Sequence, residues 1–447
     1  MSIIKPIAAR LRVRLASGIM ATLASTGFAR LRQRRGRLRR QLARGVPVLH
    51  YCHQADDPYS HLAVQRLEDL AARYRVHVVP LLVPPPEDAY KGDRERYPSW
   101  ALADARDVAP FYGVAPPALA APPHPEAVTR ANRLLAPLGP ADFAATAMAV
   151  GRRLWSGDDF AGEALPPERD ATRRLAADDR LRTRLGHYLG AMFHFEGEWY
   201  WGLDRLCHLE ARLRAEGLSR QPDAAPCVPR PMPEAVQDDA AAVTLEVFPS
   251  LRSPYTAVSF RRTLDLARRS GVRLVLRPVM PMMMRGVPAP RPKQIYILTD
   301  AAREGRACGH PLGRPVDPFG EPVRRALSLW AWADAAGRGA EYLAEYLDAA
   351  WVDGVDVTTD AGLAVVLRRA GLDWEQARSR LGGDESDAVL AANLDAMLGA
   401  GLWGVPSYRV IGGRPDAFAC WGQDRLWRVE TEIARRAADI ARVSANQ

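Results

Sequence analysis

The chain has 447 residues, of which 48% are hydrophobic and 25% charged. These proportions are ordinary for a globular protein and exclude a wholly disordered chain or a polytopic membrane protein. At roughly 150 residues per domain, the length predicts two or three domains. The net charge is +9, yet residues 1–45 hold Lys5 and eleven arginines and no acidic residue. Removing these 12 from the 61 basic residues leaves 49 against 52 acidic ones, so the body is slightly acidic and gives little support to nucleic-acid binding.

The cysteines indicate a reducing compartment. Five of them are scattered over the chain, and none belongs to a Cys-x-x-Cys pair or a zinc-type spacing, so no disulfide framework is expected. No run of about 18 apolar residues predicts a transmembrane helix. The apolar stretch from Leu15 to Leu23 is too short, and too crowded by arginine, for a convincing signal peptide. We therefore expect a cytoplasmic protein.

The basic arm ends in a dense stretch, since residues 30–44 carry eight of its eleven arginines. Four interpretations stay open: a helix on an anionic membrane, a nucleic-acid tail, a targeting segment, or a translation start mis-assigned upstream of Met20. We favour the membrane-surface helix, which would make the protein membrane-associated.

After the arm, the pattern predicts a strand, a helix and a second strand. Residues 48–51 are a short β-rich run, and Asp57 followed by proline is a helix start of the cap-and-proline kind. Apolar residues then recur at helical spacing through 63–74. A continuous apolar run over 76–83 is typical of a buried parallel strand.

The first half continues with a proline-rich, mostly helical region over 114–188. Residues 193–201 predict a hairpin with Gly197 in its turn, followed by a last helix. Five prolines within 215–242 then indicate a semi-extended linker.

The second half repeats the first. Residues 47–113 align with 243–309 without a gap, and the block 421–425 mirrors 201–205. We expect a strand over 272–280, long helical regions, and a hairpin over 408–421. Repeats of this length indicate tandem domains rather than a solenoid.

Three motifs of the second half resemble those of a known family: 253–255 opens the first helix, 404–406 opens the hairpin, and 421–425 opens the last helix. In this order they are similar to the DsbA-like group, and within it most similar to 2-hydroxychromene-2-carboxylate isomerases and kappa-class glutathione transferases. The resemblance implies an α/β protein of two tandem thioredoxin-like domains, each with a helical insertion. The predicted division is a basic arm (1–45), a degenerate DsbA-like domain (46–214), a Pro-rich linker (215–242) and a DsbA-like domain with the active site (243–447).

The start of the first helix decides the chemistry that the resemblance implies. Redox members begin this helix with Cys-x-x-Cys, whereas Ser253 and Thr256 take those positions here, so disulfide exchange is not expected. Isomerase and transferase members have a serine where Ser253 stands. Its hydroxyl can donate to the sulfur of glutathione, and the helix N-terminus adds partial positive charge, which together favour the thiolate. The alternative is that Ser253 only caps the helix.

The resemblance also implies a glutathione site around Pro406. As a cis-proline, this residue would present the Val405 backbone to the cysteinyl part of glutathione; the alternative is an ordinary trans proline. Gln423 and Asp424 resemble the pair that holds the γ-glutamyl ends. The alternative for Asp424 is an acidic residue that complements a helix dipole.

Lys293, which could anchor a substrate carboxylate, and Tyr255 are the predicted substrate contacts. Four methionines in 280–284 lie near the family's hydrophobic pocket, where they could adapt to planar ligands, although core packing explains them equally well. The family's Asn-containing stretch is not recognisable in 284–288, which weakens the transfer of substrate and cofactor contacts.

The first domain departs further from the family. Asp57 replaces the serine, and a carboxylate would repel a thiolate. Gly190-Ala191-Met192 takes the place of Gly-Val-Pro. We predict an inactive copy that supports the second domain or covers its pocket. Histidine, cysteine and aspartate crowd residues 50–61 but match no standard metal spacing, so no metal site is predicted.

The leading hypothesis is a glutathione-dependent isomerase or transferase that acts on an aromatic or conjugated carbonyl compound, with glutathione or another low-molecular-weight thiol as cofactor. One alternative is a non-catalytic thioredoxin-like scaffold. The other is a protein assigned to the DsbA oxidoreductases by its domain alone, without their Cys-x-x-Cys site. The expected partners are a small-molecule substrate, a membrane surface through the arm, and a second copy of the chain as in the kappa-class relatives.

Overall fold

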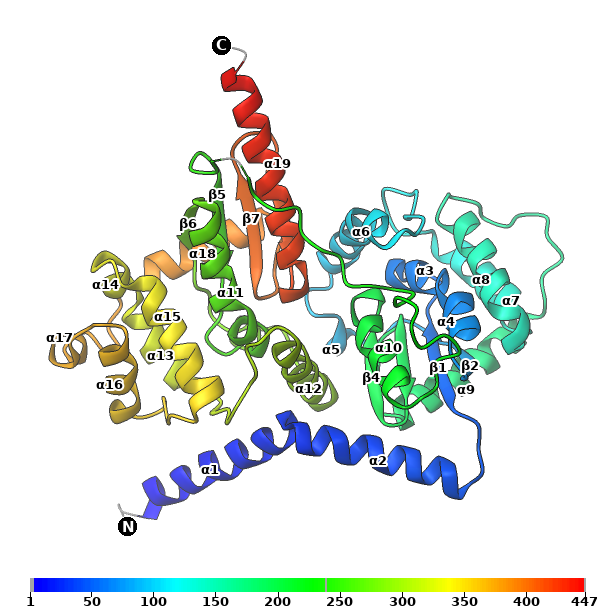
Figure 1. Ribbon diagram of the computed structural model, residues 1–447, viewed down its shortest axis with the longest axis horizontal. Coiled ribbons are helices and arrows are strands. Elements are labelled where there is room, and N and C mark those ends of the chain that lie inside the picture. Colours follow the sequence, from blue (N-terminus) through cyan, green and yellow to red (C-terminus); the bar gives the residue numbers. More distant parts are fainter. Residues whose placement is uncertain (1–3, 238, 446–447) are drawn as a thin grey trace. The chain divides into compact units, whose positions relative to one another are not determined.

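The chain folds into two compact units. The computed structural model describes residues 4–237 and 239–445 (Figure 1). The N-terminal unit spans Arg30–Pro231, and the C-terminal unit combines Met232–Gln447 with Met1–Ala29.

The basic arm forms two helices, one with each unit. α1 (Ile4–Ala24) packs against α12 (Arg291–Ala307), where Arg306 donates a hydrogen bond to the carbonyl oxygen of Ala24 at 2.7 Å. α2 (Thr26–Leu42) lies almost wholly in the N-terminal unit. The arm is therefore divided between the two units. No helix in the described part of the chain is long and apolar enough to cross a membrane.

The N-terminal unit is built on a mixed four-stranded sheet. Its strands are β1 (Val48–His53), β2 (His77–Leu82), β3 (Met192–Phe195) and β4 (Glu198–Trp201). Their order is β2-β1-β3-β4, with β1 parallel to β2 and antiparallel to β3, and β3 antiparallel to β4. The predicted hairpin is confirmed, with Gly197 in its turn at φ +87°, a conformation that glycine adopts without strain.

Helices connect and follow these strands along the chain. They are α3 (Pro58–Val64), α4 (Leu67–Arg73), α5 (Asp88–Lys91), α6 (Tyr97–Val108), η1 (Ala109–Tyr112), α7 (Pro125–Leu135), α8 (Pro140–Leu154), α9 (Glu168–Arg184), η2 (Leu203–Arg205) and α10 (Leu206–Ala215). The helix predicted through 63–74 is broken between α3 and α4. At the break, the side chains of Gln65 and Arg66 bind the carbonyl oxygens of Ala115 and Tyr112, contacts that the helical spacing does not reveal.

The C-terminal unit carries a second sheet of the same strand order. Its strands are β5 (Thr244–Phe248), β6 (Arg273–Leu276), β7 (Ser407–Ile411) and β8 (Phe418–Trp421). The order is β6-β5-β7-β8, with β5 parallel to β6 and antiparallel to β7. β6 is shorter than the predicted strand over 272–280, because Pro278 has no N–H to donate to a neighbouring strand.

The helices of the C-terminal unit include a large insertion between β6 and β7. They are α11 (Pro254–Ser270), η3 (Met282–Arg285), α12, α13 (Glu321–Ser328), α14 (Trp330–Ala335), α15 (Gly339–Asp348), η4 (Ala349–Asp353), α16 (Asp360–Arg369), α17 (Trp374–Arg378), α18 (Asp387–Gly399), η5 (Gln423–Arg425) and α19 (Leu426–Ala445). Trp330, Tyr342, Tyr346 and Trp351 are at most 4% exposed and form part of the core of the insertion. This core packs against one end of α11 and so supports the candidate site.

Candidate functional site

The first turn of α11 holds the residue predicted to be catalytic. Ser253 has extended backbone angles (φ −96°, ψ 116°) and caps the helix, with Pro254 in the first helical position. Its Oγ accepts a hydrogen bond from the backbone N–H of Thr256 at 3.1 Å and donates one to the carbonyl oxygen of Val405 at 3.4 Å. Ser253 is half-buried, so its hydroxyl lies at the edge of the site and also caps the helix.

The loop before β7 brings Val405 and Pro406 to this hydroxyl. The Val405–Pro406 peptide bond is cis, as the motif predicted. The carbonyl oxygen of Pro406 accepts a hydrogen bond from the N–H of Gly422 at 2.9 Å, which ties the loop to the start of η5. The structure therefore brings together Ser253, Val405 and Pro406 from segments that are about 150 residues apart in the chain.

Two tryptophans hold this loop in place. The rings of Trp403 and Trp421 lie 4.5 Å apart between centroids, and a Cβ on Gly404 would lie 2.2 Å from the indole of Trp421. Arg285 donates to the carbonyl oxygen of Trp403 at 2.9 Å and to that of Met280, also at 2.9 Å. The segment that follows β6 is thereby fastened to the cis-proline loop.

The methionine run serves the core at least in part. Met280 and Met284 pack against the hydrophobic core of the inserted helices. Met283 lies instead near Arg252, whose Nη1 is 3.0 Å from its sulfur. The same guanidinium pairs with Asp317 through two contacts of 2.7 and 2.8 Å. Core packing therefore accounts for two of the four methionines.

Gln423 and Asp424 lie in different environments. Gln423 is 3% exposed, and its amide donates to the carboxylate of Glu304 on α12 at 2.7 Å. Its side chain is therefore buried and its amide nitrogen is bonded within the fold. Asp424 is half-buried and lies beside Gly422, where a Cβ would meet its Oδ1 at 2.4 Å.

The predicted substrate residues both lie at or near α12. The hydroxyl of Tyr255 donates to Asp300 at 2.8 Å, and Asp300 is fully buried, so this hydroxyl joins α11 to α12. Lys293 is 9% exposed on the first turn of α12, and its burial lowers its pKa to about 8. α12 packs against α11. Lys293 thus lies on α12, the helix next to α11. The Tyr255 hydroxyl is hydrogen-bonded to Asp300 inside the protein.

The sequence pattern did not predict a role for two residues of this site. Arg285 follows the methionine run directly, and nothing in its neighbourhood indicated that it would bind two carbonyl oxygens. Glu304 offered a weak signal, because it lies four residues after Asp300 and so on the same helix face. Both carboxylates are fully buried.

The equivalent position in the N-terminal unit is closed by its own hydrogen bonds. Asp57 caps α3 and accepts from the N–H of Ser60 at 2.9 Å and from its hydroxyl at 2.7 Å. The Ser60 hydroxyl in turn accepts from the N–H of Ala191 at 2.8 Å. Burial raises the pKa of Asp57 to about 6. At the last helix, Asp204 accepts a hydrogen bond from the hydroxyl of Tyr112 at 2.7 Å.

The alignment of the two loops needs a correction by one residue. Met192 pairs with Cys52 in the sheet, as Ser407 pairs with Phe248. Ala191 therefore corresponds to Pro406, and Gly190-Ala191-Met192 does not align with Gly-Val-Pro as predicted. The matching bond from Gly202 to the carbonyl oxygen of Ala191 at 2.8 Å supports this register.

Among residues 4–237 and 239–445, no group of three or more histidine, cysteine or acidic side chains is arranged to hold a metal ion. Near Asp57, the ring of His53 lies against the rings of Tyr51 and Phe143.

Comparison with known families identifies the C-terminal half. Residues 244–434 match the model of the DSBA-like thioredoxin domain, and this part of the chain is a DsbA-like thioredoxin domain. No curated protein matches the sequence.

Several solved structures are similar to the chain. A 2-hydroxychromene-2-carboxylate isomerase is 20% identical, over 45% of this chain and 98% of its own, with a TM-score of 0.38. The cytosolic disulfide reductase DsbM from Pseudomonas aeruginosa is 17% identical, over 46% of this chain and 100% of its own, with a TM-score of 0.34. A probable DsbA oxidoreductase from Streptomyces coelicolor is 19% identical, over 44% of this chain and 89% of its own, also with a TM-score of 0.34.

We predict that Gly404→Ala disturbs the cis-proline loop. The new methyl group would overlap the Trp421 ring, so we expect a loss of about 1–3 kcal/mol in the free energy of unfolding, with a change in tryptophan fluorescence. Gly399→Ala is the control, because a Cβ there meets nothing within 4 Å. Equal unfolding free energies for the two variants would contradict the assigned packing.

We predict that Asp57→Asn changes how stability depends on pH. Burial raises the pKa of Asp57 from 3.8 to about 6, so its contribution to stability is complete below pH 4 and is lost as the pH rises through 6. In the variant, this loss, on the order of 2 kcal/mol, should disappear. Urea unfolding at pH 4 and pH 7.5 measures it.

The control for this experiment is Asp373→Asn, which alters an exposed aspartate that caps α17. Its stability should follow the wild-type pH profile. If the stability of Asp57→Asn also follows the wild-type pH profile, the Asp57 carboxyl does not cause the pH dependence.

Proposed function

We propose that the C-terminal DsbA-like domain binds a low-molecular-weight thiol such as glutathione at Ser253 and uses it in an isomerase or transferase reaction on an aromatic or conjugated carbonyl compound. The observation that carries this proposal is the position of the Ser253 hydroxyl. It lies at the N-terminus of α11 and 3.4 Å from the carbonyl oxygen of Val405, directly before the cis-proline.

The residues around this hydroxyl fit a thiol. A hydroxyl at a helix N-terminus can donate to a sulfur and, with the helix dipole, lower the thiol pKa. The Val405 backbone lies beside it, where an extended ligand can pair with main-chain groups. When bound, the thiol supplies the nucleophile that adds to a conjugated double bond and leaves again after the bond has rotated. Ser253 would hold the sulfur in its anionic form before addition and after release.

Oxygen in place of sulfur favours this chemistry over disulfide exchange. Ser253 and Thr256 occupy the two positions that cysteines take in redox members of the family. Thr256 is fully buried, and its Oγ1 accepts a hydrogen bond from the N–H of Ser250 at 3.5 Å. Neither position supplies the thiolate that an exchange reaction needs.

The remaining site residues take different parts in the proposal. Asp424, half-buried beside the loop, would hold the ammonium end of the thiol compound. Gln423 would position Asp424 from behind through its bond to Glu304. Lys293, whose burial brings its pKa to about 8, would anchor a carboxylate of the substrate.

We further propose that the N-terminal unit is a degenerate DsbA-like copy that has lost this activity. Its sheet has the same strand order, and its Tyr59–Asp104 hydrogen bond of 2.7 Å matches that of Tyr255 and Asp300 in the other unit. Asp57 and Ser60 stand at the positions that would meet a thiol, and their side chains are hydrogen-bonded to each other. Such a unit would serve as a support for the active one.

We predict that Ser253→Ala weakens glutathione binding at least tenfold and raises the pKa of the bound thiol toward its value in water. Titration calorimetry measures the affinity, and thiolate absorbance against pH measures the pKa. The change removes the hydroxyl that, in this proposal, donates to the sulfur.

Thr359→Ala is the matched control. Thr359 caps α16 in the same way, through the N–H of Gly362, so both variants should lose about 1 kcal/mol of stability while only Ser253→Ala loses binding. If Ser253→Ala binds glutathione as wild type does, the assigned mechanism fails. If the wild-type protein binds no thiol, the scaffold hypothesis is favoured.

A further inference from the structure

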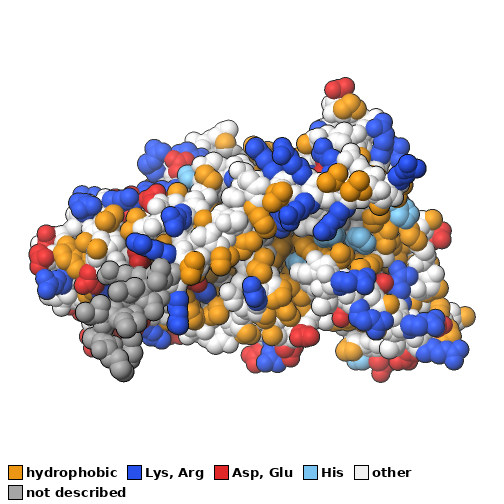
Figure 2. Space-filling view, turned by 90° about the horizontal axis from the view of Figure 1, so that it is seen from below, with side chains coloured by type: hydrophobic (Ala, Val, Ile, Leu, Met, Phe, Trp, Pro, Cys, Tyr) orange, Lys and Arg blue, Asp and Glu red, His pale blue; other side chains and the backbone are white. Residues whose placement is uncertain are grey.

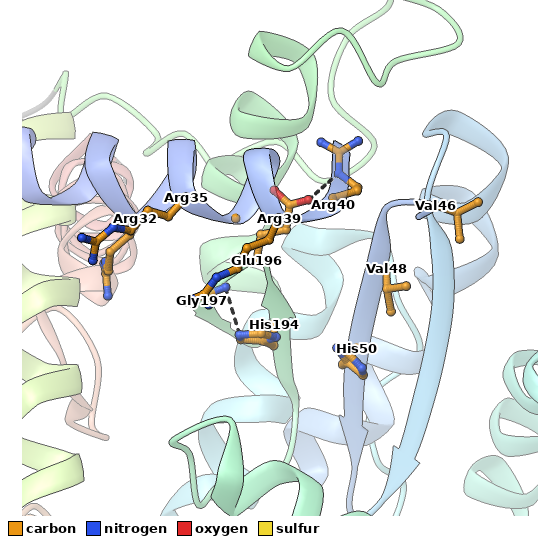
Figure 3. A pocket seen from close by; sticks show the side chains of 11 residues that line it. Arg32, Arg35, Arg39, Arg40, Val46, Val48, His50, His194, Glu196 and Gly197 are labelled. Atoms are coloured by element: carbon orange, nitrogen blue, oxygen red, sulfur yellow. Dashed lines mark hydrogen bonds and ion pairs between the residues drawn. The ribbon is translucent and has the colours of Figure 1, made fainter. Parts of the chain in front are cut away.

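The N-terminal unit contains a pocket that the proposed activity does not use. It measures about 490 Å³ and lies between α2 and the sheet, which is a usual size for a small-ligand site. Figure 3 shows arginines on α2 on one side and His50 and His194 of the sheet on the other. The pocket is therefore lined by guanidinium groups on one side and by imidazole rings on the other.

Some arginines of α2 serve to hold the helix in place. Arg40 pairs with Glu196 at 2.5 Å and with Glu216 at 3.2 Å, and Arg32 pairs with Glu198 at 3.4 Å. The contact is close, because a Cβ on Gly36 would lie 2.6 Å from the Cβ of Glu196. α2 is thus fastened to the β3–β4 hairpin and to the end of α10.

Glu196 lines the pocket but does not make it acidic. Its carboxylate contacts Arg40 and also Arg212, the latter at 3.4 Å. Both partners are largely buried, so these pairs are shielded from solvent. The negative charge at this wall is neutralised within the fold.

Arg35 and Arg39 differ from the arginines that fasten α2. Both line the pocket and both are exposed. Neither guanidinium makes an ion pair or hydrogen bond with any residue that the structure describes. They are four residues apart and therefore neighbours on one helix face. Two such guanidinium groups beside a cavity are suited to an anion that accepts several hydrogen bonds.

Two histidine rings line the pocket opposite α2. His50 and His194 face each other on β1 and β3, with ring centroids 5.7 Å apart. The Nε2 of His194 accepts the N–H of Gly197 at 3.1 Å, so the ring proton is on Nδ1. Burial lowers the pKa of His194 to about 3, which keeps the ring neutral. The Nδ1 atoms of both histidines lack a hydrogen-bond partner within the described structure, a state that a ligand or water normally relieves.

An apolar stripe runs beside the two arginines. Leu31, Leu38 and Leu42 are 45%, 55% and 76% exposed, and their spacing places them on one face of α2, next to Arg35 and Arg39. Val46, at the mouth of the pocket, is 66% exposed. Figure 2 shows basic and hydrophobic side chains interleaved on one face of the molecule, with histidines in a hollow among them.

We propose that this pocket binds the phosphate group of an anionic membrane lipid. Arg35 and Arg39 would contact the phosphate oxygens, because paired guanidinium groups match the geometry and charge of a phosphate. The leucine stripe would enter the lipid surface, as in basic amphipathic helices that lie at membranes. A soluble phosphate compound or a nucleic acid would leave these exposed leucines without a role.

The first test measures binding of the full chain to vesicles. Wild-type protein should bind vesicles of phosphatidylcholine with phosphatidic acid and not vesicles of phosphatidylcholine alone. The R35A/R39A variant should bind about tenfold more weakly than the control R30A/R34A, which removes the same charge from exposed positions outside the pocket. If the two variants lose the same amount of vesicle affinity, the attraction depends only on total charge, and the proposed role of the pocket is wrong.

The second test separates the lipid from other phosphate sources. The L38S/L42S variant alters only exposed positions. It should no longer bind vesicles. Inorganic phosphate should still protect the pocket histidines of this variant from chemical modification. Binding of inorganic phosphate by wild-type protein that ignores anionic vesicles would overturn the lipid assignment. Tight binding of mixed-sequence DNA would also overturn it if R35A/R39A and R30A/R34A weakened that binding to the same extent. Thermal midpoints of all variants establish that they fold.

Discussion

Two buried carboxylates on one helix hold the candidate site together. Asp300 and Glu304 lie one turn apart on α12, and both are fully buried. Asp300 accepts a hydrogen bond from Tyr255 in the first turn of α11, and Glu304 accepts one from Gln423 at the start of η5. A buried carboxylate is costly unless it is hydrogen-bonded, so these two partners are strongly specified. α12 thereby sets the separation between the helix cap and the last helix.

The two units differ mainly in where their polar groups are used. In the N-terminal unit, the N–H of Ala191 donates to the hydroxyl of Ser60, which also donates to Asp57. Proline at the position of Ala191 has no N–H, so Pro406 makes no such bond in the C-terminal unit. There the loop carbonyl of Val405 meets the half-buried hydroxyl of Ser253. The Ser60 hydroxyl is buried and bonded to Asp57, whereas the Ser253 hydroxyl is half-buried and has a long bond of 3.4 Å to the Val405 carbonyl oxygen.

Two groups of arginine on α2 have different surroundings. Those that face Glu196, Glu198 and Glu216 hold α2 against the hairpin and α10. These ion pairs involve carboxylates that are mostly buried, where attraction is stronger than at an open surface. The exposed Arg35 and Arg39 lie beside the pocket, and no acidic residue in the described part of the chain pairs with them. α2 is thus a structural part of the N-terminal unit as well as a basic surface.

Local signals in the sequence determined where the elements of the site begin. The cap and proline at Ser253 and the hairpin turns each depend on a few adjacent residues, and these predictions are confirmed. The cis bond before Pro406 was implied by the family resemblance of the motif, and it is confirmed as well. The partners of those residues were decided only by tertiary structure. Gln423 turns inward because Glu304, far away in the chain, lies opposite it, and the Tyr255 hydroxyl is taken by Asp300 for the same reason. Such contacts arise from the packing of distant segments, which no local pattern encodes.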